Sequence, residues 1–175
     1  MTNAVLPSFA VLAGRREYFL THDLSGLPPE FVRRIGELAE HRYLDHLDAV
    51  LGVVQEVTNG ATEYVRIMSD RPVHIEHRNP RPGSISVRII LPRSFDREVQ
   101  ALLEQNWPGA RVEIGFLEPI PATLVLNETR AGIQFPGLDG QVDMNRGLAG
   151  EAPAFQGWCR DLFDALWARA RKALS

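Results

Sequence analysis

The C-terminal stretch from Pro153 to Leu174 constrains the fold more than any other part of the chain. Its apolar side chains recur at three- and four-residue steps, which predicts an amphipathic helix that begins near Pro153. The apolar face contains Phe155, Trp158, Cys159, Leu162, Phe163, Leu166, Trp167, Ala170 and Leu174. Burying one large aromatic side chain contributes about 2 to 3 kcal/mol, so this face must be covered by a sheet or by a partner subunit.

From Glu63 onward the apolar period changes to two residues, which indicates strands. We expect strands over 64–68, 85–91 and 111–117, with a helix from Ser94 through Asn106 between the last two strands. A strand, helix and strand in so short a span form a crossover unit, whose strands are parallel. The segments Ala122–Leu126 and Ala131–Phe135 predict a late hairpin added to the same sheet.

The N-terminal third is expected to be mainly helical. Val5–Leu12 suits a short helix or a loop, and Glu17–Thr21 reads as a short strand. A helix should open at Glu30 after a pair of prolines, and a second helix should run from Leu44 to Val57 and pack on the first. The expected fold class is therefore α/β: a mixed sheet with a strand-helix-strand crossover and a late hairpin, an N-terminal helical hairpin, and a long amphipathic C-terminal helix.

Composition limits the classes of function. A chain of 175 residues fits one compact domain, here residues 1–175. Its 19 basic and 22 acidic residues leave none of the basic excess that a nucleic-acid binder working alone carries. The single cysteine, Cys159, allows no intrachain disulfide, and the apolar runs are too short to cross a bilayer. We expect a cytoplasmic protein without membrane contact.

Motifs of common catalysis are absent from the sequence. It contains neither G-x-x-x-x-G-K-[ST] nor G-x-G-x-x-G, which argues against nucleotide binding of the usual kinds. It also lacks a G-x-S-x-G elbow, and Cys159 lies within an apolar helical pattern where a thiolate is poorly solvated. The sequence therefore predicts no enzyme and no cofactor.

Three runs are distinctive: HDLSGLPPEF (residues 22–31), GLDGQVD (residues 137–143) and WCRDLFDALW (residues 158–167). Together they resemble the effector domain of the archaeal methanogenesis-regulator family, transcription factors in which a winged-helix DNA reader precedes a sensor half. The resemblance extends from about Leu6 to Leu174. It implies a small-molecule effector, a homodimer, and DNA contact only through a domain absent from this chain, with residues 1–14 as the linker from that domain.

The same resemblance implies a phospholipase D-like fold in its non-catalytic form. Enzymes with that fold need a histidine and a lysine two residues apart, whereas Lys172 is the only lysine of this chain.

Candidate ligand-binding side chains are expected around a cavity at the carboxyl ends of the strands, where ligands commonly bind in α/β folds. The candidates are His22, Arg88, His74, Asp143 and Trp158. Each also has a structural explanation. Asp23 suits a turn cap with His22 bonding locally, and Asp143 follows the turn formers of GLDG. Trp158 belongs by default to the core, and Arg88 either reaches solvent on an edge strand or binds a ligand carboxylate bidentately.

His74 and His77 in VHIEH are the best metal candidates, with Glu76 as a third ligand. Side chains alternate in an extended segment, which separates His77 from the other two, and no remote cysteine pair completes the set. We therefore expect no metal site.

The prediction is a ligand-sensing, dimerising effector domain of an archaeal transcriptional regulator. Two alternatives stay open. One is a metal-dependent hydrolase that uses His74, Glu76 and His77, and the other is a ligand-free dimerisation scaffold in which the C-terminal helix holds two chains together.

Overall fold

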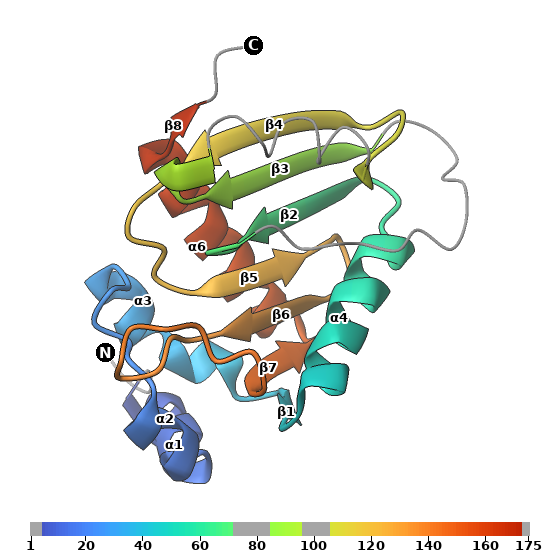
Figure 1. Ribbon diagram of the computed structural model, residues 1–175. Helices are drawn as coiled ribbons and strands as arrows, with labels where there is room; N and C mark the ends of the chain where they lie inside the picture. Colours follow the sequence, from blue (N-terminus) through green and yellow to red (C-terminus); the bar gives the residue numbers. More distant parts are fainter. Residues whose placement is uncertain (1–4, 72–84, 96–105, 173–175) are drawn as a thin grey trace.

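An eight-stranded mixed sheet forms the centre of the protein (Figure 1). The computed structural model describes residues 5–71, 85–95 and 106–172. The strands follow the order β1-β7-β6-β5-β2-β3-β4-β8. Strand β3 pairs in parallel with β2 and β4, and the remaining neighbours are antiparallel. The strands are β1 (Arg42–Leu44), β2 (Tyr64–Met68), β3 (Ser86–Leu91), β4 (Arg111–Phe116), β5 (Thr123–Leu126), β6 (Ala131–Gln134), β7 (Gly147–Gly150) and β8 (Arg171–Lys172).

Helices cover both faces of this sheet, with α4 in front and α6 behind in Figure 1. The helices are α1 (Val5–Gly14), α2 (Arg16–Thr21), α3 (Pro29–Arg33), α4 (Leu47–Gly60) and α6 (Pro153–Arg169), with short 3-10 helices η1 (Ile35–Leu38) and η2 (Arg93–Phe95). One apolar cluster joins α6 to α2, α3, η1 and the sheet, and a second joins α4 to the opposite face.

The alternation of side chains along the strands explains the two layers. In β2, Val65 and Ile67 pack in the cluster with α4, whereas Met68 packs in the cluster with α6. In β3, Val87 and Ile89 face α4, and Ile90 faces α6. The face toward α4 is apolar along both strands, whereas the opposite face carries Arg66 and Arg88 beside the apolar Met68 and Ile90.

The structure confirms the predicted fold class. The parallel pair β3 and β4, the late hairpin of β5 and β6, the N-terminal helices and the long helix from Pro153 are all present. The predicted helix from Ser94 to Asn106 lies mostly outside the described residues. The expected packing of the helix from Glu30 on the helix over 44–57 was wrong: α3 and α4 lie in different apolar clusters, and each covers its own face of the sheet. Residues Arg42–Leu44 form strand β1, so the second helix begins at Leu47.

The prediction of a strand at Glu17–Thr21 was wrong, because these residues belong to helix α2. Tyr18 is the buried residue of α2, and its neighbours Glu17 and Leu20 are exposed. Thr21 Oγ1 donates to the carbonyl oxygens of Glu17 and Tyr18 and so closes the last turn. The run of large side chains from Tyr18 to Leu20 resembles a strand only when it is viewed alone.

The aromatic face of α6 is covered by the chain's own sheet and N-terminal helices. Phe155, Trp158, Leu162 and Phe163 are fully buried within one protomer. This face of α6 is therefore not free to hold a second chain.

Gly150 of β7 provides a test of this packing. A Cβ atom there would lie 2.6 Å from Cγ of the fully buried Phe155. We expect Gly150→Ala to lower the free energy of unfolding by about 1 to 3 kcal/mol, because overpacking forces the ring or the strand to move. A Cβ atom added to Gly157 in α6 would meet no atom of another part of the protein within 4 Å. Gly157→Ala should instead stabilise by about 0.5 to 1 kcal/mol. Urea unfolding of both variants measures the difference, and equal effects would contradict the packing.

Candidate functional site

The segment between β6 and β7 builds the candidate site. Its centre is a tight turn, in which the Gly137 N–H donates to the Gln141 carbonyl oxygen at 2.8 Å. Gly140 has a φ of +77°, a left-handed conformation that glycine adopts without strain. The Asp139 carboxylate accepts from the Gln141 N–H at 3.0 Å. Sequence analysis predicted these turn formers, and the turn holds Asp143 at its far end.

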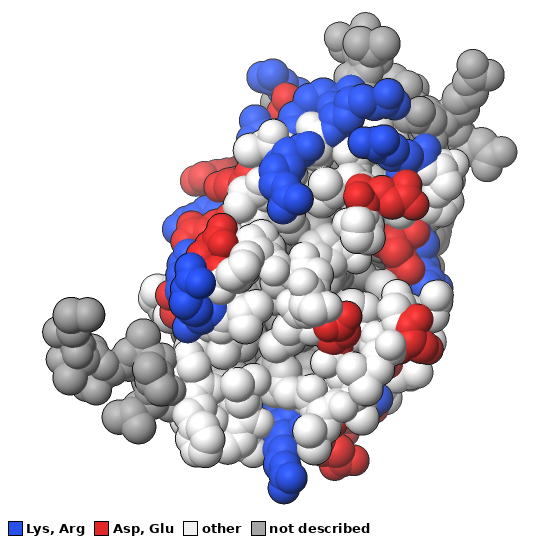
Figure 2. Space-filling model, turned by 90° about the vertical axis from the view of Figure 1, so that its left-hand side faces the viewer, with Lys and Arg blue, Asp and Glu red and all other residues white. Residues whose placement is uncertain are grey.

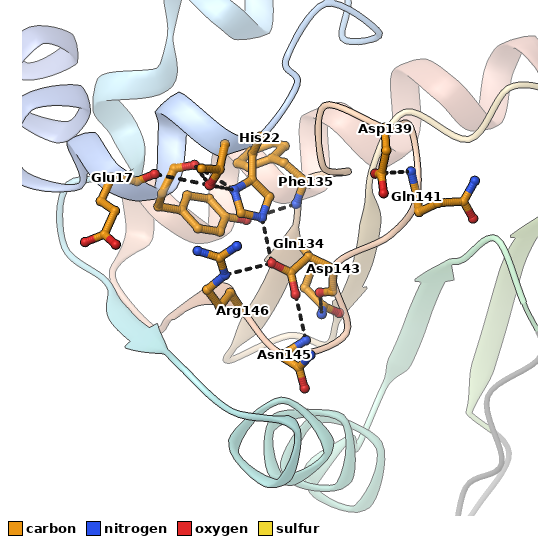
Figure 3. Close-up of polar contacts among 11 residues, drawn as sticks. Glu17, His22, Gln134, Phe135, Asp139, Gln141, Asp143, Asn145 and Arg146 are labelled. Atoms are coloured by element: carbon orange, nitrogen blue, oxygen red, sulfur yellow. Dashed lines mark hydrogen bonds and ion pairs between the residues drawn. The ribbon is translucent and has the colours of Figure 1, made fainter.

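Asp143 is the hub of the polar contacts in Figure 3. Its Oδ2 atom lies 2.9 Å from Nε2 of His22 and accepts from Nε of Arg146 at 2.8 Å. Its Oδ1 atom accepts from the Asn145 N–H at 2.9 Å. The Gln134 side chain donates to the Asp143 carbonyl oxygen at 2.7 Å. Residues from the end of α2, from β6 and from the loop therefore converge on Asp143.

His22 ends helix α2 and is buried, with its ring between two acceptors. Nδ1 lies 2.6 Å from the Tyr18 carbonyl oxygen, and Nε2 faces the Asp143 carboxylate. Both ring nitrogens therefore lie within hydrogen-bond distance of an oxygen atom. The Tyr18 ring stacks on the His22 ring at a centroid distance of 3.8 Å. The His22 ring is therefore held between an aromatic face and a carboxylate.

The surroundings of Asp143 keep it ionised. Burial raises the pKa of this carboxyl, but hydrogen bonds from the Asn145 backbone, Arg146 and His22 outweigh burial and hold the pKa below its ordinary value. Burial raises the pKa of the Tyr18 hydroxyl well above its ordinary value. The neutral Tyr18 hydroxyl accepts from the Phe135 N–H at 3.1 Å, which fastens α2 to the end of β6.

A pocket of about 360 Å³ opens beside this network. Its wall combines polar side chains with the apolar Leu138 and Val142. The lining residues are Thr21, Gly137, Leu138, Asp139, Gln141, Val142, Asp143 and Arg146. Arg146 donates from Nε to Asp143, and its side chain is 35% exposed. The pocket therefore offers a guanidinium, carboxylates and an amide to a small polar molecule.

The structure brings His22 and Asp143 into direct contact, although 121 positions separate them. The two other described candidates lie elsewhere. Arg88 donates to Glu113 at 3.0 Å on the sheet face and lies over the Trp167 ring. Trp158 is fully buried in the core, where its Nε1 donates to the Phe31 carbonyl oxygen at 3.1 Å. His74 lies outside the described residues.

Asp23 behaves as its turn-cap explanation predicts, since its carboxylate accepts from the Ser25 N–H at 2.8 Å and from the Ser25 hydroxyl at 2.9 Å. His22 bonds to the local Tyr18 carbonyl but also reaches the distant Asp143. Sequence analysis missed Arg146 and Tyr18. A signal for Arg146 was its position three residues after Asp143 in a turn-rich segment, where an ion pair forms easily.

A larger hollow of about 680 Å³ lies beside α4, over β7 and β1. Its arginines are already paired: Arg42 with Glu56 at 3.3 Å, and Arg130 with Glu56 at 3.3 Å and with Glu151 at 3.2 Å. These groups neutralise one another, so we place the candidate site at Asp143.

Within 5–71, 85–95 and 106–172, no three His, Cys, Asp or Glu side chains gather closely enough to hold a metal ion. The predicted set of His74, Glu76 and His77 falls outside these ranges. In the same ranges, no helix combines the length and apolar character needed to cross a bilayer.

Comparison with known proteins finds a likeness of fold. No protein-family model matches the chain, and no curated protein matches it. Among solved structures, the fold is similar to that of TrmBL2, described as an archaeal chromatin protein with a novel mode of DNA binding. The TM-score is 0.55 at 10% sequence identity, over 75% of this chain. The match covers 53% of the TrmBL2 chain, so this chain spans about half the length of its structural neighbour.

Proposed function

We propose that this chain is a ligand-sensing and dimerising effector domain of an archaeal transcriptional regulator, and that it senses a small molecule without catalysing a reaction. The pocket beside the His22–Asp143 pair carries the proposal, since it exposes an arginine held in place by a buried network. The similarity of fold to TrmBL2, an archaeal DNA-binding protein, supports a regulatory setting. DNA contact is assigned to a separate domain, because this chain has no basic excess.

The chemistry of the pocket wall favours a small polar ligand. Arg146 offers N–H donors to a carboxylate or to hydroxyl oxygens, and Asp139 and Gln141 accept from hydroxyl groups. A volume of about 360 Å³ lies within the range of small-molecule sites. Since Arg146 shares Asp143 with His22, a ligand that attracts Arg146 changes the contact that holds the end of α2. The ligand shifts the population of α2 arrangements by its differential affinity for them.

A thermal-shift screen with small carboxylates, sugars and acyl metabolites tests this proposal. We expect at least one compound to raise the melting temperature, and we expect Arg146→Gln to weaken its binding tenfold or more, since a hydrogen bond to a charged group contributes about 1.5 to 3 kcal/mol.

Arg34→Gln is a matched control for that screen. Arg34 forms an ion pair of the same spacing with Glu37, also at 2.8 Å, and its side chain is 36% exposed. This variant should bind the compound with wild-type affinity. Failure of every compound, or equal binding by Arg146→Gln, would contradict the proposed site.

A further inference from the structure

Helix α1 has no charged residue on any side. Its sequence, VLPSFAVLAG, contains only apolar residues, glycine and one serine. A helix on the surface of a soluble protein normally turns charged side chains to water, and a helix that is apolar all round is normally covered. The composition of α1 is therefore that of a helix in contact on both sides.

Among the side chains of α1 whose burial the structure describes, residues 8–14, one side is covered within the protomer. Val11 is buried, and the Ser8 hydroxyl donates to the Arg33 carbonyl oxygen at 3.2 Å. The outer side carries Phe9, which is 70% exposed, and Leu12, which is 37% exposed. The exposed side therefore carries the aromatic ring of Phe9, and α1 leaves an apolar face open to water.

The open face continues across α2 to the rim of the pocket. Leu20 of α2 is 62% exposed, and Leu138 of the pocket wall is 71% exposed. The two residues belong to neighbouring segments, because the Leu138 N–H donates to the carbonyl oxygen of Thr21. Figure 2 shows few charged side chains over the lower part of the molecule, where α1 and α2 lie. We call Phe9, Leu12, Leu20 and Leu138 the N-terminal apolar face.

The charge pattern of this face fits a second copy of the same chain. Identical patches meet in a two-fold dimer, so any net charge at the centre would face its own sign. None of the four residues of the N-terminal apolar face is charged. At the junction of α1 and α2 lie the exposed Arg16 and Glu17, whose opposite signs can pair across a two-fold axis. Charge-poor apolar centres with charged rims are typical of protein interfaces.

We infer that the N-terminal apolar face is the surface through which two copies of this chain associate. The inference rests on the dimerising part of the proposed function and names the surface that performs it. It assigns the interface to α1 and α2 and not to α6, whose aromatic face is buried. Leu138 and Thr21 line the pocket, so the inferred interface lies directly beside it. A bound ligand and a second copy of the chain would therefore contact the same segment.

Sedimentation equilibrium of the full chain tests the inference. We expect the wild type to have twice the protomer mass of 19.6 kDa. Phe9→Glu and Leu20→Glu should each raise the dimer dissociation constant about a hundredfold, because a buried interface anchor is replaced by a charge facing its own copy. Leu51→Glu is the matched control, since Leu51 on α4 is 40% exposed and lies outside the face. Circular dichroism confirms that each variant is folded, and Leu20→Glu supplies the test if Phe9→Glu does not fold.

Mixing variants distinguishes this surface from others. Leu20→Glu and Leu20→Arg, each monomeric alone, should form a mixed dimer because the introduced charges attract. A wild-type dimer that persists in both glutamate variants would overturn this surface and leave the proposed function standing. A wild type that stays monomeric would overturn both the surface and the dimerising role, while the screen with Arg146→Gln judges ligand sensing separately.

Discussion

Trp158→Ala is expected to lower the free energy of unfolding by about 3 to 5 kcal/mol, the range for deleting a buried aromatic side chain. Trp158 is fully buried between the sheet and the N-terminal helices. Its ring contacts Phe31 and Phe135 edge to face, with centroid distances of 5.6 and 6.4 Å. The substitution removes this packing and leaves the Phe31 carbonyl oxygen without its donor at 3.1 Å. Urea unfolding followed by circular dichroism gives the value.

Two further variants separate packing from hydrogen bonding at this position. Trp158→Phe keeps a ring but loses the N–H group, so it should cost about 1 to 3 kcal/mol. Trp167→Ala, on the same helix, should cost less than Trp158→Ala because Trp167 is only partly buried. A larger loss from Trp167→Ala would show that the core is not centred on Trp158.

Asp143→Ala is expected to cost about 1.5 to 3 kcal/mol near neutral pH, because it removes the charged acceptor that faces the buried His22 ring and accepts from Arg146. The side chains of His22 and Asp143 are 1% and 15% exposed. The same substitution also removes the acceptor for Arg146 and for the Asn145 N–H. Asp161→Ala is the control, since Asp161 pairs with Arg34 at 2.7 Å but is 46% exposed. Exposed pairs contribute about 1 kcal/mol or less.

The cost of Asp143→Ala should depend on pH in a defined direction. The folded protein holds the pKa of Asp143 below its ordinary value of 3.8. Below that value the unfolded chain binds the proton more readily, so the contribution of this carboxylate is complete above pH 3.8 and disappears as the pH falls through the folded pKa. The gap in unfolding free energy between wild type and Asp143→Ala should therefore narrow as the pH falls below about 4. A gap that widens on acidification would contradict the assignment.

Segments with a strong period could be predicted from the sequence. The helix begins at Pro153 and the strand at Tyr64, as predicted. In both segments the apolar pattern of the sequence matches the side chains that pack in the core. The short strands β1, β7 and β8 escaped prediction, since segments of two to four residues carry no readable period. Their pairing is decided by the neighbouring strands.

In the candidate site, single residues could be predicted from the sequence, but the contacts between them could not. Local turn chemistry singled out His22 and Asp143 separately, but their contact depends on the fold that brings the end of α2 beside the β6–β7 loop. No rule of sequence spacing predicts a contact between residues that lie 121 positions apart. Arg88 illustrates the reverse case, since its partner Glu113 stands directly opposite on β4 and becomes visible only once the strand register is known.

The hydrogen bond from Trp158 to the Phe31 carbonyl oxygen joins a helix made late in synthesis to a segment made early. While the ribosome is still adding residues before Pro153, the N-terminal helices cover only their own part of this sheet face, and the part beneath α6 stays open to water. A nascent chain therefore completes this core only after α6 has left the exit tunnel.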